Sequence, residues 1–310
     1  MKEEAQFCSI RGLVVADTYR IVHKIGEDGC GTIYRAEDIA TKEDLRLKKL
    51  DKEDFDAGVK EVYRRLREAR HPNVGRIHEF IEEEDCYWVV MELIHGEAAE
   101  HFICEVDHME DCTPIPADDF WKIVDGVLKG LEYVHADPDI MVYHRNVTAD
   151  NVMITFTEAN QLESVQLIDF ELCHDIPDNS MDGLGEDDVP VGTRGYKAPE
   201  LYAGRFDQRS DLFAVGVIAW RLITHKWPYY LTHRMAEEMD NDKIRETITE
   251  QLQESLSFQC GWVLTSLAMY PGASSLLKLL LAPDPNDRAA SASEALRHLA
   301  DVRPCSTAPS

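Results

Sequence analysis

Short apolar runs with strand-like spacing fill the first third of the chain. Hydrophobic positions alternate or run together between clusters of Gly, Pro and charged residues. The expected strands are residues 19–25, 32–38, 45–50, 76–82 and 86–94. One helix is expected at 56–70, where Val59, Val62, Leu66 and Ala69 recur at helical spacing and define an inward face.

After residue 95 the pattern becomes helical. Residues 118–135 carry apolar positions at helical spacing, and Asp118 and Asp119 are expected to cap this helix. The chain is helical again from Asp211 onward, and a β-rich first third before a helical remainder predicts an α+β protein with two lobes. Two short strands are expected between these helices, at 152–156 and 164–170. The predicted divisions are an N-terminal extension at 1–18, a β-rich lobe at 19–94, a helical lobe at 95–302 and a tail at 303–310.

Composition and charge narrow the functional classes. The chain has 310 residues, 44% of them hydrophobic, which is globular composition and excludes general disorder. The formal charge of −26 argues against partners such as nucleic acid or an anionic membrane. The eight Cys form no CxxC pair, which indicates a reducing environment. No secretory signal is recognisable and the longest apolar stretch, 212–220, is too short to span a bilayer, so we expect a cytoplasmic protein.

A glycine-rich turn separates the first two expected strands. Gly26, Gly29 and Gly31 lie in the segment IGEDGCGTIY, where glycine allows backbone N–H groups to approach a phosphate. The segment lacks the Gly-Lys-Ser/Thr of a P-loop, and a strand rather than a helix follows it, unlike a dinucleotide-binding turn. On its own the segment is equally compatible with a plain hairpin turn.

Further motifs follow this turn in a fixed order. They are RLKKL with Lys48, HPNV, YHRNVTADNVMI, LIDFE, GTRGYKAPE, SDLFAVGVIAW and DPNDR. In order and spacing the set resembles the eukaryotic-type protein kinase family, of the Ser/Thr type, from about Tyr19 to His298. The resemblance implies a bilobal protein-kinase-like fold, with a small β-rich N-lobe and a larger, mostly α-helical C-lobe.

The resemblance also implies roles for particular residues. Lys48 is expected to bind the α- and β-phosphates of ATP, and Asn151 and Asp169 to hold Mg²⁺. The other residues expected to bind ATP are Gly26, Gly29, Gly31 and Ile33 around the phosphates and Met91, Glu92 and Ile94 near the adenine. Glu200 and Arg288 are expected to form a buried ion pair, and Asp211 has a structural role at the start of a helix.

Four positions depart from the family pattern. Asn146 stands where the family has the aspartate that accepts the substrate's proton, and an amide is a very poor base. Thr148 replaces the lysine that contacts the γ-phosphate, and Glu171 replaces the glycine after Asp169-Phe170. Asp28 replaces the middle glycine of the loop, where its charge is expected to repel the phosphates unless a metal screens it.

The helix residue that pairs with Lys48 is left open by the sequence. Counting back from the HPNV motif places Val62 at the position where the family has a glutamate. Glu61 is adjacent, but about 100° around the helix. Glu61 is therefore a candidate partner of Lys48 only if the helix shifts locally.

Two segments allow both a functional and an ordinary interpretation. The acidic residues between Asp169 and Thr193, where Ser180 is the only serine, either mimic a phosphate that pairs with Arg145 or form a solvated loop. The residues His101, Cys104, His108 and Cys112 have side chains that suit zinc, but we prefer to interpret the segment as an irregular linker.

Three functions remain for this set of motifs. The first is an ATP-binding pseudokinase that transfers phosphate very slowly or not at all and acts through protein partners. The second is an active, atypical Ser/Thr kinase, in which Asp150 is the first candidate for a replacement base acting on a protein substrate. The third, a small-molecule phosphotransferase, is disfavoured by the GTRGYKAPE motif. The oligomeric state is left open.

Overall fold

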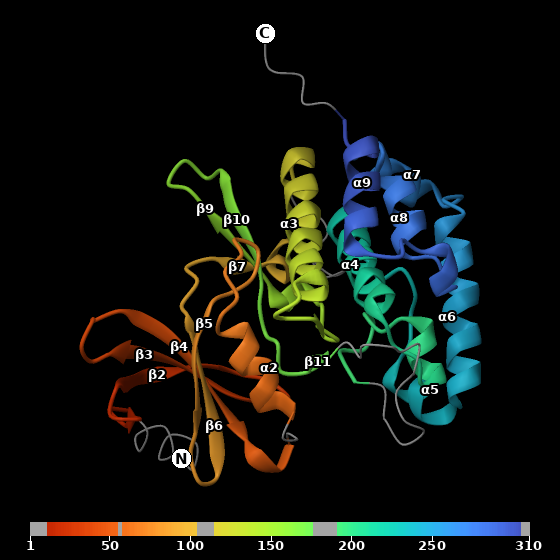
Figure 1. Ribbon diagram of the computed structural model, residues 1–310. Helices are drawn as coiled ribbons and strands as arrows, with labels where there is room; N and C mark the ends of the chain where they lie inside the picture. Colours follow the sequence, from red (N-terminus) through yellow and green to blue (C-terminus); the bar gives the residue numbers. More distant parts are fainter. Residues whose placement is uncertain (1–10, 55–57, 104–114, 176–190, 305–310) are drawn as a thin grey trace. The chain divides into compact units, whose positions relative to one another are not determined.

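A computed structural model of the chain describes residues 11–54, 58–103, 115–175 and 191–304 (Figure 1). The chain divides into two compact units, Met1–His95 and Gly96–Ser310. The described elements of the first unit are β1 (Val14–Val15), β2 (Tyr19–Glu27), β3 (Gly31–Asp38), β4 (Asp44–Asp51), a 3-10 turn (Lys52–Asp54), α2 (Gly58–Leu66), β5 (Ile77–Glu82) and β6 (Cys86–Glu92).

The strands of the first unit form one antiparallel sheet in the order β1-β2-β3-β4-β6-β5. Strand β4 lies in the interior of this sheet, hydrogen-bonded to β3 on one side and to β6 on the other. Alternating apolar residues of these strands, among them Leu45, Leu47 and Trp88, form a buried cluster. The five strands predicted from the sequence are all present in this sheet.

Helix α2 packs against β5 through the inward face expected from its period. Val62 and Leu66 are almost fully buried, and the ring of Tyr63 stacks on Phe80 of β5 with 5.1 Å between centroids. The predicted helix at 56–70 was too long, because the described helix ends at Leu66. The chain continues in turns toward Pro72, whose ring disfavours helical backbone in the residue before it.

The second unit is mainly helical. Its described strands are β7 (Glu97–Ala98), β8 (Val142–Tyr143), β9 (Val152–Phe156), β10 (Leu162–Leu167) and β11 (His174–Asp175). Its α-helices are α3 (Ala117–Ala136), α4 (Gln208–Thr224), α5 (His233–Glu238), α6 (Asn241–Leu256), α7 (Gly261–Ala268), α8 (Ala273–Leu280) and α9 (Ala292–Val302). Its 3-10 turns are Ala99–Phe102, Ala149–Asn151, Pro199–Ala203 and Pro285–Asp287.

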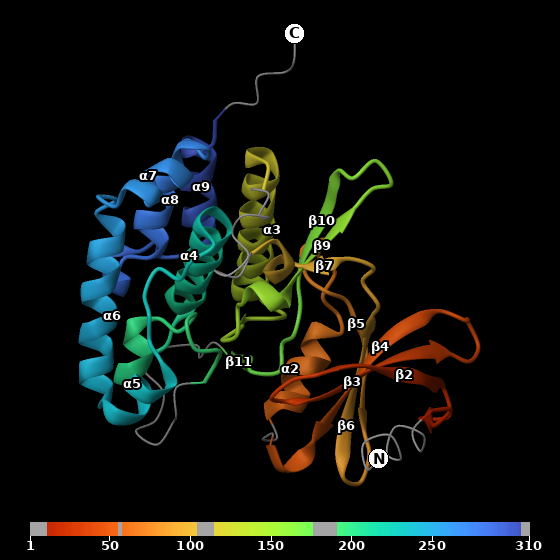
Figure 2. The same cartoon turned by 180° about the vertical axis from the view of Figure 1, so that it is seen from behind.

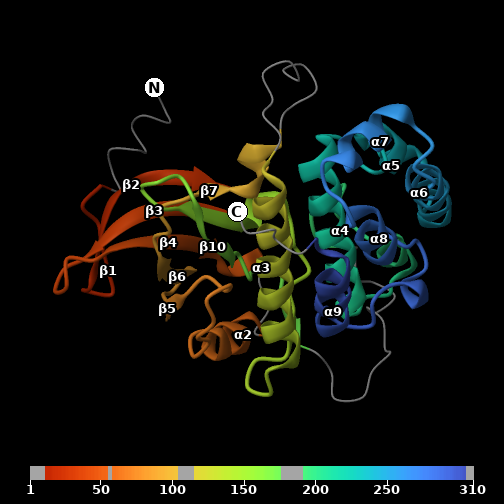
Figure 3. The ribbon, with the colours of Figure 1, turned by 90° about the horizontal axis from the view of Figure 1, so that it is seen from above.

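Helix α4 forms the centre of this unit. It is apolar on nearly all sides, as a helix surrounded by protein should be, and fifteen consecutive residues from Ser210 to Thr224 are buried. Figures 2 and 3 show α4 between α3 and α8, and both helices contact it. The buried apolar residues of α3 confirm its predicted inward face; they are Val124, Val127, Leu128, Leu131 and Val134.

The predicted cap of α3 was wrong. Pro116 is the N-cap residue and supplies no side-chain hydrogen bond. Asp118 and Asp119 lie in the first turn instead, where their charges interact favourably with the helix dipole. Aspartate is enriched both at the N-cap of helices and in their first turn, so the sequence alone did not separate these two positions.

No single helix in the described part of the chain combines the length and hydropathy needed to cross a bilayer. Helices α7 and α8 pass such a test only as a pair, and they meet at an angle of 117°.

Candidate active site

Lys48 occupies a buried position in the interior of the first unit's sheet. The strand register places it between Ile33 of β3 and Val89 of β6, both of them buried. Its side chain is 1% exposed, and its Nζ donates to Oδ2 of Asp28 at 2.6 Å. A buried ammonium group needs an anionic partner, and a loop residue twenty positions earlier in the chain supplies one.

Asp28 also organises the glycine-rich turn. Its Oδ1 accepts the backbone N–H groups of Cys30 at 2.9 Å and Gly31 at 3.0 Å. The sequence led us to expect a charge that repels phosphate; it gave no sign that this carboxylate would bind both Lys48 and the loop backbone. Side chains so far apart in sequence are brought together only by the pairing of β2, β3 and β4.

The glycines of this turn have different structural requirements. A Cβ on Gly31 would lie 2.0 Å from the backbone oxygen of Lys49, so the pairing of β3 with β4 requires glycine there. A Cβ on Gly29 would meet nothing within 4 Å, and one on Gly26 would make ordinary contact with Ile33. Glycine at position 31 is therefore explained by strand geometry, whether or not a phosphate binds.

Glu61 is not directed toward the core of the first unit. Its carboxylate forms a two-pronged ion pair with Arg64, at 2.9 and 2.8 Å, on the exposed side of α2. Val62 faces inward, as the helical period requires. This arrangement gives no support to the shift that would pair Glu61 with Lys48.

The residues expected near an adenine lie at the end of β6 and just after it. Met91, Glu92 and Ile94 are all half-buried. The carboxylate of Glu92 accepts the backbone N–H of Arg76 at 2.8 Å, and its own N–H donates to the oxygen of Arg76 at 3.0 Å. These bonds fix the end of the strand.

In the second unit, Asp211 holds the loop that contains Asn146. Asp211 lies in the first turn of α4 and is almost fully buried. Its carboxylate accepts the backbone N–H groups of His144 at 2.8 Å and Arg145 at 2.9 Å, and Nε2 of His135 lies 2.8 Å away. Burial alone would raise the pKa of Asp211, but these hydrogen bonds and the neighbouring imidazoles outweigh it and leave the pKa below its usual value.

His144 connects this loop to the segment that carries Asp169. Its Nε2 donates to the backbone oxygen of Ile168 at 3.1 Å, and its Nδ1 accepts the N–H of Asn146 at 3.3 Å. Its ring packs on Phe170 with 4.7 Å between centroids. Complete burial lowers the pKa of His144, so the ring is a neutral, structural element of the site. Asp169 follows in the left-handed region at φ 68°.

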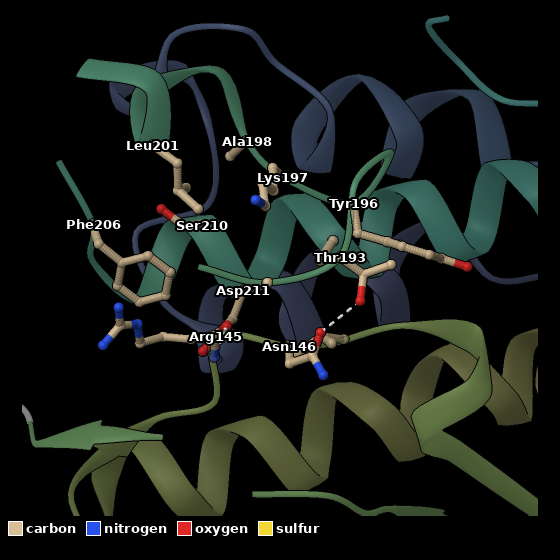
Figure 4. A pocket seen from close by; sticks show the side chains of 13 residues that line it. Arg145, Asn146, Thr193, Tyr196, Lys197, Ala198, Leu201, Phe206, Ser210 and Asp211 are labelled. Carbon is tan, nitrogen blue, oxygen red and sulfur yellow. Dashed lines mark hydrogen bonds between the residues drawn. The ribbon is translucent and has the colours of Figure 1, made fainter. Parts of the chain in front are cut away.

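Asn146 and Thr148 are held in hydrogen bonds within the protein. The side-chain oxygen of Asn146 accepts the hydroxyl of Thr193 at 2.9 Å, as Figure 4 shows. The side-chain nitrogen of Asn151 donates to the backbone oxygen of Asn146 at 2.9 Å. Thr148 is buried, and its hydroxyl accepts the N–H of Asn151 at 3.3 Å, so it caps the short 3-10 turn.

A polar network beside this loop was missed by the sequence analysis. Arg221 of α4 forms a two-pronged ion pair with Glu100, both bonds at 2.6 Å, and also donates to the hydroxyl of Tyr196. Tyr196 in turn accepts the N–H of Ala149 at 3.2 Å. Partial burial and then the charge of Glu100 raise the pKa of nearby Asp150. Tyr196 belongs to the GTRGYKAPE motif, which was the one available signal for this network.

Glu200 and Arg288 form an ion pair in the interior of the second unit. The two guanidinium nitrogens of Arg288 lie 2.5 and 2.8 Å from the carboxylate oxygens of Glu200. Arg288 also donates to the backbone oxygen of Ala282 at 2.6 Å, and Ser210 donates to Glu200 at 2.8 Å. The pair joins the segment after Gly192 to the turn before α9.

Some candidates fall outside the described residues. Of the possible zinc ligands, Cys104, His108 and Cys112 lie outside them, and His101 is an exposed residue 3.5 Å from Glu97. Ser180 and most of the acidic segment also lie outside. Glu171, where the family has glycine, is buried.

A comparison with protein families assigns most of the chain to one family. A model described as "Protein kinase domain" matches residues 19–299. This chain belongs to the protein kinase family. The resemblance noted from the motifs is thereby confirmed.

Curated relatives of this kinase-family chain come from bacteria, plants and animals. It is 25% identical over 288 residues to the serine/threonine-protein kinase pkn2 of Myxococcus xanthus, with 91% of this chain and 32% of that protein covered. It is 30% identical over 223 residues to PknJ of Mycobacterium tuberculosis, with 68% and 34% covered. It is 26% identical over 253 residues to Nek10 of Homo sapiens, with 77% and 20% covered. The chain thus spans about a third or less of the length of these relatives.

A solved structure shares the fold. The crystal structure of Rad53 1-466 in complex with AMP-PNP matches with a TM-score of 0.69 at 22% identity, covering 91% of this chain and 64% of that one. The predicted α+β class, with a β-rich N-lobe and a helical C-lobe, is therefore confirmed for this kinase-family chain.

Proposed function

We propose that this chain is an ATP-binding pseudokinase, with absent or very slow Ser/Thr phosphotransfer, that acts through protein partners. The observation that carries the proposal is the amide at position 146. An amide oxygen cannot take up a proton at neutral pH, and in Asn146 that oxygen already accepts the hydroxyl of Thr193. General-base help is worth roughly 10²- to 10⁴-fold in rate, so its loss severely slows transfer.

Thr148 adds a second deficit at the same loop. A lysine at this position would place a positive charge near the transferring phosphoryl group. Thr148 is neutral, and its hydroxyl is engaged with the N–H of Asn151. Positions 146 and 148 therefore provide neither a general base nor a positive charge for phosphoryl transfer. The loop backbone is nevertheless held in place by hydrogen bonds to Asp211 and His144.

The oxygen donors needed for a metal ion are retained. We include Asn151 and Asp169 as the residues that hold Mg²⁺, which would neutralise phosphate charge when bound. The Asn151 nitrogen donates to Asn146, so its side-chain oxygen is the atom left to bind a hard cation. Amide and carboxylate oxygens suit Mg²⁺, and the donor set therefore fits the ion.

The proposed nucleotide contacts come from the first unit. They are Gly26, Gly29, Gly31, Ile33 and Lys48 for the phosphates and Met91, Glu92 and Ile94 for the adenine. Glu61 is left out of this set because Arg64 holds its carboxylate on the exposed side of α2.

A γ-phosphate transfer assay tests the proposal. The purified chain is incubated with labelled Mg·ATP and a library of Ser/Thr peptides, and self-labelling is followed in parallel. We expect transfer at background level. Asn146→Asp combined with Thr148→Lys should raise the rate by about 10²-fold or more, because both missing groups are restored. Asp169→Ala in that double variant should abolish the gain, since it removes a metal ligand.

The alternative is an active, atypical Ser/Thr kinase. It is favoured by Asp150, a carboxylate on the same loop whose pKa is raised by partial burial and by Glu100, which makes it a better base. Turnover by the natural chain at ordinary kinase rates, roughly 1–100 s⁻¹, that is lost in Asp169→Ala would establish this alternative. Loss of that turnover in Asp150→Asn would then identify the base.

A further inference from the structure

The carboxylate of Asp28 binds the same donors that a phosphate group would use. Its Oδ1 accepts two backbone N–H groups of the glycine-rich turn, those of Cys30 and Gly31 at 2.9 and 3.0 Å. Its Oδ2 accepts the ammonium group of Lys48 at 2.6 Å. Backbone amides of a turn and a lysine together form a typical anion site, and here a side chain of the chain itself occupies it.

The turn alone does not account for this arrangement. Asp38, the last residue of β3, makes the same kind of turn, because its Oδ1 accepts the N–H groups of Ala40 and Thr41, both at 2.8 Å. Asp28 differs in what its second oxygen contacts, which is the buried Lys48. Asp38 is thus a matched example of the same turn without this lysine.

The surroundings of Lys48 make the contact strong. Its neighbours across the sheet are the apolar Ile33 and Val89, and its side chain is 1% exposed. An ammonium group in such a place is stabilised by a negative partner far more than on the surface. The Asp28 side chain is 36% exposed, so it can leave without unfolding the sheet.

We propose that Asp28 is a built-in substitute for a nucleotide phosphate, so that the site binds ligands of the adenosine type, which lack phosphate, about as tightly as it binds nucleotides. A phosphate entering this site must displace the carboxylate from Lys48 and from the turn, and must then remain near its negative charge. The phosphates of ATP therefore add little to binding. This inference rests on the proposed nucleotide-binding function and specifies its ligand class.

Isothermal titration with three ligands tests the inference. Adenosine, Mg·ATP and inorganic triphosphate are titrated into the natural chain and its variants. Asp28→Asn removes the charge but keeps an oxygen for the turn, and Asp28→Gly removes the side chain altogether. Asp38→Asn is the matched control, because it makes the same change in the same kind of turn. Circular dichroism confirms that each variant is folded.

The natural chain should bind adenosine and Mg·ATP with dissociation constants within about threefold of each other. Asp28→Asn should tighten Mg·ATP by about tenfold or more, leave adenosine unchanged and create measurable triphosphate binding. Asp38→Asn should behave as the natural chain does. Adding Lys48→Met to Asp28→Asn should remove the gain, because Lys48 is the cation that attracts the phosphates.

The contrary outcomes separate this inference from the proposed function. If the natural chain binds Mg·ATP at least about tenfold more tightly than adenosine and Asp28→Asn changes nothing, the inference is wrong and nucleotide binding stands. If the natural chain binds none of the ligands while Asp28→Asn binds triphosphate and Mg·ATP, Asp28 does occupy the phosphate position, but natural nucleotide binding and the predicted binding of adenosine are both wrong. If no folded variant binds any ligand, both are wrong.

Discussion

The buried pair of Glu200 and Arg288 allows a quantitative prediction. Arg288 has a fully buried side chain, and that of Glu200 is 9% exposed. Arg288→Met removes both bonds to Glu200 and the bond to the oxygen of Ala282, and it leaves a carboxylate in the interior. Breaking one side of a buried pair typically costs about 3–5 kcal/mol. Because Ser210 still donates to Glu200, we expect the lower end, about 3 kcal/mol.

Urea unfolding followed by circular dichroism measures this cost. Nearly all helices described for the chain lie in the second unit, so the helical signal reports on the unit that contains the pair. A loss of about 3 kcal/mol should lower the urea midpoint by about 1 M. Arg245→Met serves as control, since Arg245 and Asp242 form an exposed pair at 2.9 Å in the same unit and its loss should leave the midpoint within error.

A double-mutant cycle separates the pair from simple loss of packing. The guanidinium of Arg288 also lies over the ring of Phe213, 4.8 Å from its centroid, so Arg288→Met loses contacts other than the charge pair. Glu200→Gln in the Arg288→Met background removes the stranded charge and should recover about 2 kcal/mol relative to additivity. A cost of less than about 1 kcal/mol for Arg288→Met, or strictly additive effects, would refute the argument from burial.

Two further predictions concern the glycine-rich turn and pH. Gly31→Ala should destabilise the first unit or prevent its folding, because the added Cβ would lie 2.0 Å from the backbone oxygen of Lys49. Gly29→Ala should be tolerated, because its Cβ would meet nothing within 4 Å. Equal melting temperatures of the two variants would contradict this prediction. Burial lowers the pKa of His144, so the unfolded chain takes up a proton near pH 6.5 that the folded chain does not, and stability should fall as the pH drops from about 7 to 5. In His144→Phe the change of the free energy of unfolding with pH should decrease by up to about 1.4 kcal/mol per pH unit. Part of the pH dependence should remain, because burial also lowers the pKa of His225. An unchanged pH dependence in His144→Phe would argue against a neutral, buried His144.

The sequence by itself determined the five long strands of the first unit, the long helices and the family. The period of two in the first third and the helical spacing in α3 and α4 are local properties, and the structure has these elements where the patterns predicted them. The order of the short motifs was likewise readable without coordinates, because each motif is a contiguous segment. The ends of the helices were predicted less well, as the end of α2 and the N-cap of α3 show. Neighbouring residues there have similar helix and capping propensities.

The tertiary structure decided which side chains meet. Lys48 and Asp28 are twenty positions apart, Asn146 and Thr193 forty-seven, and Asp211 and His144 sixty-seven. The period of a helix or strand gives the face on which a residue lies, but not the partner that the chain brings to that face from a distance. A buried ammonium or carboxylate must find a partner, and several acidic residues were available to Lys48 in the sequence. The pairing of β2, β3 and β4 placed Asp28 within reach of Lys48, while the helical period turned Glu61 outward to Arg64.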